Sequence, residues 1–184
     1  RIGGASGFWG DSMVGAPQLV NSGLIDYLVF DYLAETTMAI LAAARLRRPE
    51  LGYATDFVDI AMKEVLPEVM TRGIKVVANA GGINPQGCAE ALKALADSLG
   101  LSPRIAVVEG DDVSALMPAL RREGAVDMFT GDVLPEQVLS ASAYLGALPV
   151  AAALARGADI VITGRGVDSA VTLGVLIHEF GWSP

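Results

Sequence analysis

Residues Lys75–Pro85 read KVVANAGGINP, an apolar run that stops abruptly at an asparagine and a pair of glycines. The apolar part predicts a buried strand over Ile74–Ala78. Asn84 suits a helix cap and Pro85 the first helical position, so the same stretch predicts a helix that runs to about Leu99. A strand followed directly by a helix is the repeating unit of a parallel sheet.

The same unit recurs along the chain. Four other short apolar runs predict strands that end in glycine or a polar residue: Arg1–Ala5, Asp26–Phe30, Arg104–Val108 and Asp159–Ile162. Because most of these runs precede a helical pattern, we expect an α/β fold of three layers with a mostly parallel sheet, Rossmann-like or doubly wound. A closed βα barrel is the alternative, since five such units do not fix closure.

Apolar spacing and capping residues predict the remaining helices. One of them is expected to be interrupted near Pro67 and another to bend at Pro149, and the last is expected to be capped by Asp168. The expected ranges are Met13–Ser22, Ala34–Arg47, Phe57–Met70, Ser114–Glu123, Ser140–Arg156 and Asp168–Phe180.

Length and composition predict a single α/β domain over residues 1–184, expected to be the incomplete N-terminal portion of a longer chain. The chain is 52% hydrophobic and only 18% charged. A surface so poor in charge suggests contact with other protein. We therefore expect a homo-oligomer, or association with a missing C-terminal region.

Net charge and cysteine content limit the classes of partner and the cellular compartment that are expected. Thirteen basic against twenty-one acidic residues give a net charge of -8, which disfavours nucleic acid and anionic membranes. The longest apolar stretch with almost no charge, Ala141–Ala155, is too short to span a bilayer. Cys88 is the only cysteine, so no internal disulfide can form, and a cytoplasmic location is expected.

The carboxyl ends of parallel strands meet at one edge of the sheet, where binding groups usually gather. In the first loop, Gly4 and Gly7 allow backbone amides to approach an anion and Ser6 adds a hydroxyl. The alternative for this loop is a tight strand-to-helix turn.

The loop after Ile74–Ala78 is a second candidate for anion binding. Asn79, Gly81, Gly82 and Asn84 lead into a helix start, where free amides and the helix dipole favour phosphate or carboxylate. Simple capping by Asn84 is the alternative.

The loop around Arg165 is the strongest anion candidate. Arg165 offers a planar fork for carboxylate or phosphate, with Thr163, Asp168 and Ser169 as neighbouring ligand-binding residues. An internal salt bridge between Arg165 and Asp168 is the alternative.

Three carboxylates are candidates for catalysis by proton transfer: Asp31, Glu35 and Asp111. Glu35 has a structural alternative, because acidic residues are favoured in the first turn of a helix. Oxygen ligands around Gly110 would also suit magnesium, with capping as the alternative, but nothing in the sequence demands a metal.

Six motifs, in this order, resemble the acyclic terpene utilisation protein A family. They are GGASGFWGDS at 3–12, DYLVFDYLAE at 26–35, NAGGINP at 79–85, GDD at 110–112, TGR at 163–165 with DSA at 168–170, and IHEFGW at 177–182. The resemblance covers essentially the whole chain and corresponds to the N-terminal part of a longer protein. It implies a role near the breakdown of branched or terpenoid acids as acyl-CoA, with a CoA thioester as a candidate substrate.

The sequence therefore predicts an anion-binding cleft for a small acidic or CoA-linked molecule. Carboxylate acid/base chemistry of the hydratase, lyase or isomerase type is one hypothesis, with no cofactor evident. A non-catalytic ligand-binding or assembly subunit is the other hypothesis.

Overall fold

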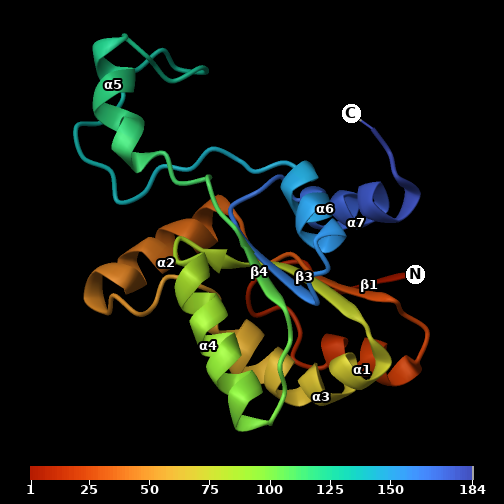
Figure 1. The fold of residues 1–184 in the computed structure, drawn as a ribbon. Helices are drawn as coiled ribbons and strands as arrows, with labels where there is room; N and C mark the ends of the chain where they lie inside the picture. The colour runs from red at the N-terminus through yellow and green to blue at the C-terminus, as the bar shows by residue number, and fades with distance from the viewer. Residues whose placement is uncertain (184) are drawn as a thin grey trace.

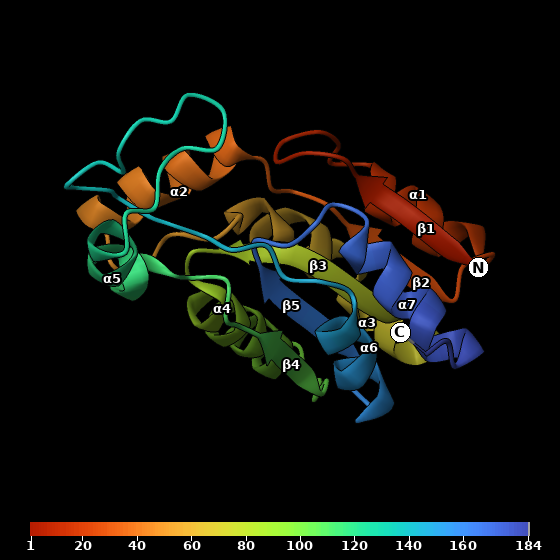
Figure 2. The ribbon, with the colours of Figure 1, turned by 90° about the horizontal axis from the view of Figure 1, so that it is seen from above.

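The structure, a computed structural model, describes residues 1–183. Its centre is a five-stranded sheet in the order β1-β2-β3-β5-β4, in which every neighbouring pair is parallel (Figure 2). The described strands form an open sheet with β1 and β4 at its edges. Their bounds are β1 Ile2–Ser6, β2 Tyr27–Phe30, β3 Lys75–Gly82, β4 Ile105–Val108 and β5 Ile160–Gly164.

Helices cover both faces of this sheet, which confirms the expected α/β fold. Figure 1 shows α1, α3 and α4 against one face and α6 and α7 against the other. The helical segments are α1 Gly15–Ser22, α2 Glu35–Arg47, the π-helix η1 Phe57–Met62, α3 Lys63–Arg72, α4 Pro85–Ser98, the 3₁₀ segment η2 Ser114–Leu116, α5 Met117–Arg122, α6 Leu148–Ala155 and α7 Ala170–Phe180. None of them is long and apolar enough to cross a membrane, within the residues described.

Each face of the sheet has its own hydrophobic core. The larger core is centred on Phe30, whose ring centroid lies 5.5 Å from that of Tyr32 and 5.3 Å from that of Phe57. Cys88 belongs to this core and is fully buried, which raises the pKa of its thiol. The smaller core lies between the sheet and α6 and α7, around Val77, Val161 and other branched residues. Burial on both faces explains why β2, β3 and β5 read as continuous apolar runs.

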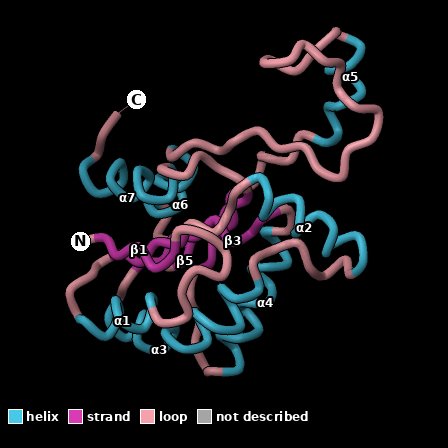
Figure 3. Tube along the Cα trace, turned by 180° about the vertical axis from the view of Figure 1, so that it is seen from behind, coloured by secondary structure: helices cyan, strands magenta, loops and turns pink. Residues whose placement is uncertain are grey.

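Residues 109–147, which we call the arm, connect β4 to α6 and extend away from the sheet (Figures 1 and 3). Three large apolar side chains near its tip, Met128, Phe129 and Val133, are 84%, 87% and 81% exposed. The arm then returns to the sheet through residues 140–147.

The helix expected over Ser140–Arg156 is wrong in its first half, since α6 begins only at Leu148. The preceding residues run between two other segments of the chain. Val113 N–H donates to Ala141 O (2.9 Å), and Leu145 N–H donates to Arg165 O (3.1 Å). These long-range partners replace helical hydrogen bonds, and Pro149 lies in the first turn of α6, where proline is well tolerated.

Two smaller expectations also need correction. Pro67 lies inside α3, and the irregular part of this region is η1 instead. Asp168 does not cap α7, because Ser169 occupies the N-cap position and the Asp168 carboxylate accepts a hydrogen bond from Arg165.

The strand order creates a crevice at the carboxyl ends. β5 lies between β3 and β4, so the chain leaves β3 through α4 on one face and returns to β5 through α6 on the other. The neighbouring strands β3 and β5 are followed by α4 and α7 on opposite faces (Figure 1), so the loops after these two strands diverge, which is where α/β sheets commonly bind ligands.

Candidate functional site

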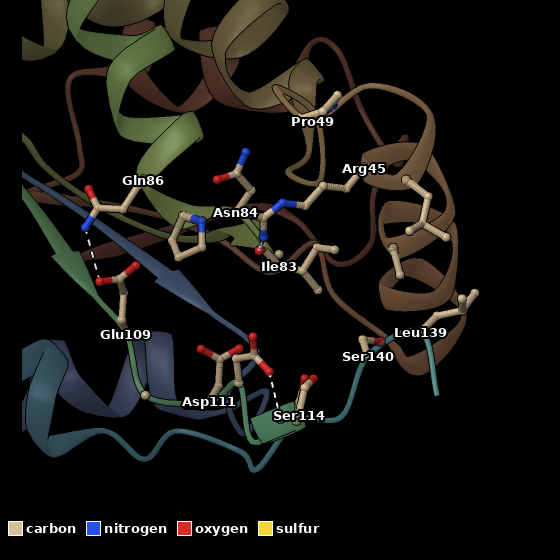
Figure 4. A pocket seen from close by; sticks show the side chains of 17 residues that line it. Arg45, Pro49, Ile83, Asn84, Gln86, Glu109, Asp111, Ser114, Leu139 and Ser140 are labelled. Carbon is tan, nitrogen blue, oxygen red and sulfur yellow. Dashed lines mark hydrogen bonds between the residues drawn. The ribbon is translucent and has the colours of Figure 1, made fainter. Parts of the chain in front are cut away.

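A cleft of about 540 Å³ lies at this edge of the sheet (Figure 4). Its walls are α2, the corner between β3 and α4, the loop after β4 and the returning part of the arm. The residues that contribute polar groups are Arg45, Asn84, Gln86, Glu109, Asp111, Asp112, Ser114, Ser140 and Ser142.

The corner between β3 and α4 is built by local sequence. Asn84 Oδ1 accepts from Gly87 N–H (3.2 Å), which confirms the capping role expected for Asn84, and its Nδ2 donates to Leu51 O (2.9 Å). A Cβ on Gly81 would lie 2.6 Å from Thr163 O, and Gly82 has a φ of +55° beside Gly52. Both glycines are therefore required for the chain to turn this closely past β5.

The floor of the cleft carries three acidic side chains from the loop after β4. Glu109 Oε2 accepts from Gln86 Nε2 (3.1 Å), and Asp112 Oδ1 accepts from Ser114 N–H (2.9 Å). Asp111 is 5% exposed, and its Oδ2 accepts from Arg165 N–H (2.7 Å). Burial raises the pKa of Asp111 above its ordinary value, although the bond from Arg165 opposes this. The cleft thus holds a buried carboxyl group that is fixed by a backbone hydrogen bond and has a raised pKa.

Arg165 is the centre of a second cluster beside the cleft. Its guanidinium is buried and donates to Asp168 Oδ1 (2.8 Å) and to Glu35 Oε1 (3.0 Å). The same group lies 4.3 Å from the ring centroid of Tyr144, whose hydroxyl donates to Glu35. Arg165 Nε is buried without a partner in the described residues. Both the expected salt bridge and a free donor are therefore present.

A side pocket of about 250 Å³ opens beside this cluster, lined by Glu35, Met38, Ala39, Ser140, Ser142, Tyr144 and Arg165. Ser140 and Ser142 line both this pocket and the cleft. The two cavities are therefore neighbours across one segment of the arm.

The pKa values of Asp31 and Glu35 are shifted in opposite directions. Asn79 is 1% exposed, and its Nδ2 donates to Asp31 Oδ1 (2.5 Å) while its Oδ1 accepts from Tyr32 N–H (2.6 Å). Burial raises the pKa of Asp31, against the hydrogen bond from Asn79. Hydrogen bonds from Tyr144 and Arg165 instead lower the pKa of Glu35 to about 2. At neutral pH Glu35 is therefore a permanent anion.

The residues expected from the sequence are only partly brought together. Asn84, Gly82 and Asp111 line the cleft, and Glu35 and Arg165 line the side pocket. The other expected residues line neither cavity: Asp168 contacts Arg165, Asn79 contacts Asp31, Gly81 packs against Thr163, and Ser169 lies at the start of α7.

The first loop lies apart from both cavities. Gly4, Ser6 and Gly7 line neither of them, and Gly7 N–H donates to Asp11 Oδ2 (2.8 Å). Ser6 adjoins the site only through its carbonyl, which accepts from Asp31 N–H (3.2 Å).

Sequence reasoning missed Tyr144, Arg45, Gln86 and Ser140. Tyr144, Ser140 and Ser142 lie in the segment expected to be helical. The sequence signal that could have placed the start of this helix after Ser140 is a glycine close to a proline, Gly146 and Pro149.

In residues 1–183, no group of three or more His, Cys, Asp or Glu side chains is arranged to hold a metal ion.

The family model of acyclic terpene utilisation family protein AtuA matches residues 1–184. The chain matches no curated protein and no solved structure. Since the family match spans the whole chain, the chain belongs to the acyclic terpene utilisation family AtuA.

Proposed function

We propose that this member of the acyclic terpene utilisation family binds a small acidic or CoA-linked molecule and acts on it by carboxylate acid/base chemistry. A hydratase, lyase or isomerase reaction in the breakdown of branched or terpenoid acids would use such chemistry. The observation that carries the proposal is Arg165, which lines the side pocket and whose buried guanidinium has an Nε without a partner in the described residues.

The partners of Arg165 leave room for an incoming anion. The side chains of Glu35 and Asp168 are 73% and 69% exposed, so an anion from solvent can reach the position that either carboxylate occupies. A ligand carboxylate or phosphate can replace one of them and take up Nε as a second donor. Two parallel N–H bonds from one guanidinium are stronger and more specific than one.

Asp111 is the proposed proton carrier. A ligand held at Arg165 extends past Ser140 and Ser142 into the cleft, where Asp111 is fixed by the backbone N–H of Arg165. Because its pKa is raised, Asp111 is a better proton donor and acceptor for such chemistry than an exposed aspartate. Asp31, whose pKa is also raised by burial but which lines neither cavity, is a second candidate. Glu35, being a permanent anion, serves better as a counter-ion of Arg165.

The first test is thermal stabilisation by a panel of acyl-CoAs and free branched acids. A ligand that binds the folded state raises the melting temperature. We expect a clear shift that Arg165→Gln removes, because glutamine lacks the charge and the fork. No shift with any ligand would overturn the binding part of the proposal.

The second test uses a ligand that binds and follows its conversion to product. Asp111→Asn keeps an oxygen for the Arg165 N–H but loses the proton, so turnover should fall at least a hundredfold while binding persists. Asp97→Asn, an exposed aspartate on α4 that lines neither cavity, is the matched control and should retain activity. Full activity in Asp111→Asn would reject its role and favour a non-catalytic binding or assembly subunit.

A further inference from the structure

β4 lies at one edge of the sheet, and its outer side has no partner in the described part of the chain (Figure 2). Ile160 pairs with Ile105, and its N–H donates to Arg104 O (3.2 Å). In a parallel ladder, alternate residues face opposite neighbours. The N–H and C=O groups of Ile105 and Val107 therefore point away from β5, toward the open edge.

A groove of about 400 Å³ runs along this edge between β4 and α6. Its lining is mostly small or apolar and includes Ala106, Val108, Pro149, Ala152 and Ala153. Protein edges are usually protected by an internal charge, a proline or a bulge. Residues 105–108 contain no charge and no proline, and their pairing with β5 has no register shift.

The opposite edge of the sheet differs. β1 contains two glycines, and its pairing with β2 shifts register between Gly4 and Ser6. Such irregularity discourages the addition of another strand. The edge formed by β4 is therefore the one suited to extend the sheet.

We propose that β4 pairs antiparallel with β4 of a second copy of this chain, around a two-fold axis that passes beside Ala106. The two sheets then join into one. The axis is perpendicular to the sheet, so each residue and the residue that it pairs with on the partner strand lie on the same face of the sheet. Ile105 then exchanges hydrogen bonds with the partner subunit's Val107, and Val107 with the partner subunit's Ile105, which uses all the outward groups of both residues.

Size and charge along the groove suit a second copy. In this register Ala106 meets its own counterpart in a non-hydrogen-bonded pair, where Cα atoms lie about 4.5 Å apart and a small side chain fits best. Arg104 and Arg156 line one end of the groove and Glu109 the other. An antiparallel arrangement brings the basic end of each copy to the acidic end of its partner, which favours this orientation.

Cross-linking tests both the interface and its register. In this register the two cysteines of an Ala106→Cys dimer lie opposite each other, with Cα atoms close enough for a disulfide. The two cysteines of a Val107→Cys dimer do not pair, and their Cα atoms lie too far apart along the strands. The native Cys88 is fully buried and should therefore contribute little to the cross-linking. Under mild oxidation we expect Ala106→Cys to form covalent dimer at least tenfold more than Val107→Cys. Equal cross-linking of the two variants would overturn the proposed register.

Light scattering tests the association of the uncross-linked chain. We expect a mass twice the 19.1 kDa of one chain. Val107→Pro removes only an outward N–H and should give a monomer with unchanged circular dichroism. Ala106→Pro, the matched control, removes an N–H used by β5 and should lower the melting temperature instead.

Three results would overturn the proposal. The first is a wild-type chain that stays monomeric up to about 100 μM, a range in which a stable dimer would form. The second is a Val107→Pro variant that remains dimeric. The third is dissociation by Phe129→Asp together with a dimeric Val107→Pro, which would assign the interface to the arm.

Discussion

The two ends of the sheet use acidic side chains in opposite ways. At the amino end, Asp159 accepts hydrogen bonds from Lys75 Nζ (2.7 Å) and Arg104 N–H (2.8 Å), and so ties together the starts of β3, β4 and β5. Burial opposes ionisation of Asp159, but these bonds outweigh it and lower its pKa to about 2. At the carboxyl end, burial prevails and raises the pKa of Asp31 and Asp111.

The contrast separates carboxylates whose ionised form stabilises the fold from carboxyl groups whose ionised form destabilises it. A carboxylate with a lowered pKa stabilises the folded state, whereas one with a raised pKa is disfavoured there once ionised. Perturbed groups of the second kind gather at functional sites. The amino end therefore holds the strands together, and the carboxyl end is where ligand chemistry is expected.

The largest change in the free energy of unfolding should come from a larger side chain at the carboxyl end of the sheet. Gly81→Ala would bring its Cβ within 2.6 Å of both Thr163 O and Pro85 Cβ, so the backbone must shift. We expect a loss of about 3 kcal/mol in the free energy of unfolding, measured by urea denaturation. Gly4→Ala, with no atom within 4 Å, is the control and should change stability little. Equal losses in both variants would show that the crevice between β3 and β5 is not tightly constrained.

Removing the charge at the amino end should have a smaller effect. Asp159→Asn should cost about 2 kcal/mol at pH 7, because a lowered pKa stabilises the fold above the unfolded value of about 4. That stability is lost as the pH falls through about 2, so variant and wild type should converge in acid. Urea denaturation at pH 7 and near pH 2 measures this. A difference that persists unchanged in acid would contradict the assignment to ionisation.

The smallest effect should come from the corresponding change at the carboxyl end. The folded pKa of Asp111 is raised, so its contribution to stability is present at low pH and is lost as the pH rises through that pKa. Asp111→Asn should therefore match the wild type near pH 4 and be equally or more stable at pH 8. Melting temperatures at both values provide the comparison. Marked destabilisation of the variant at pH 8 would mean that ionised Asp111 stabilises the fold.

Local patterns predicted the part of the site that depends on neighbours in the sequence. The cap at Asn84 and the proline that follows it act within one helical turn, and the bond between Arg165 and Asp168 spans three positions. Those residues could be assigned from sequence because their chemistry is complete over a few residues.

The rest of the site depends on contacts that no local pattern encodes. Tyr144 meets Glu35 across 109 positions, and Asn79 meets Asp31 across 48. The segment around Tyr144 is rich in alanine and favours a helix when considered alone. Its extended conformation follows from hydrogen bonds to residues 111–113 and 165 instead, a case in which tertiary context overrides propensity.

The position of β5 has a consequence for the order in which the protein forms. β5 is the last described strand in the chain, yet it is the only neighbour of β4 in the sheet. During synthesis β1, β2 and β3 can assemble as soon as they emerge, whereas β4 must wait, with both sides unpaired, until more than fifty further residues have followed. A chain that ended before Ile160 would therefore contain an unpaired apolar strand, β4, and such truncated products are expected to aggregate.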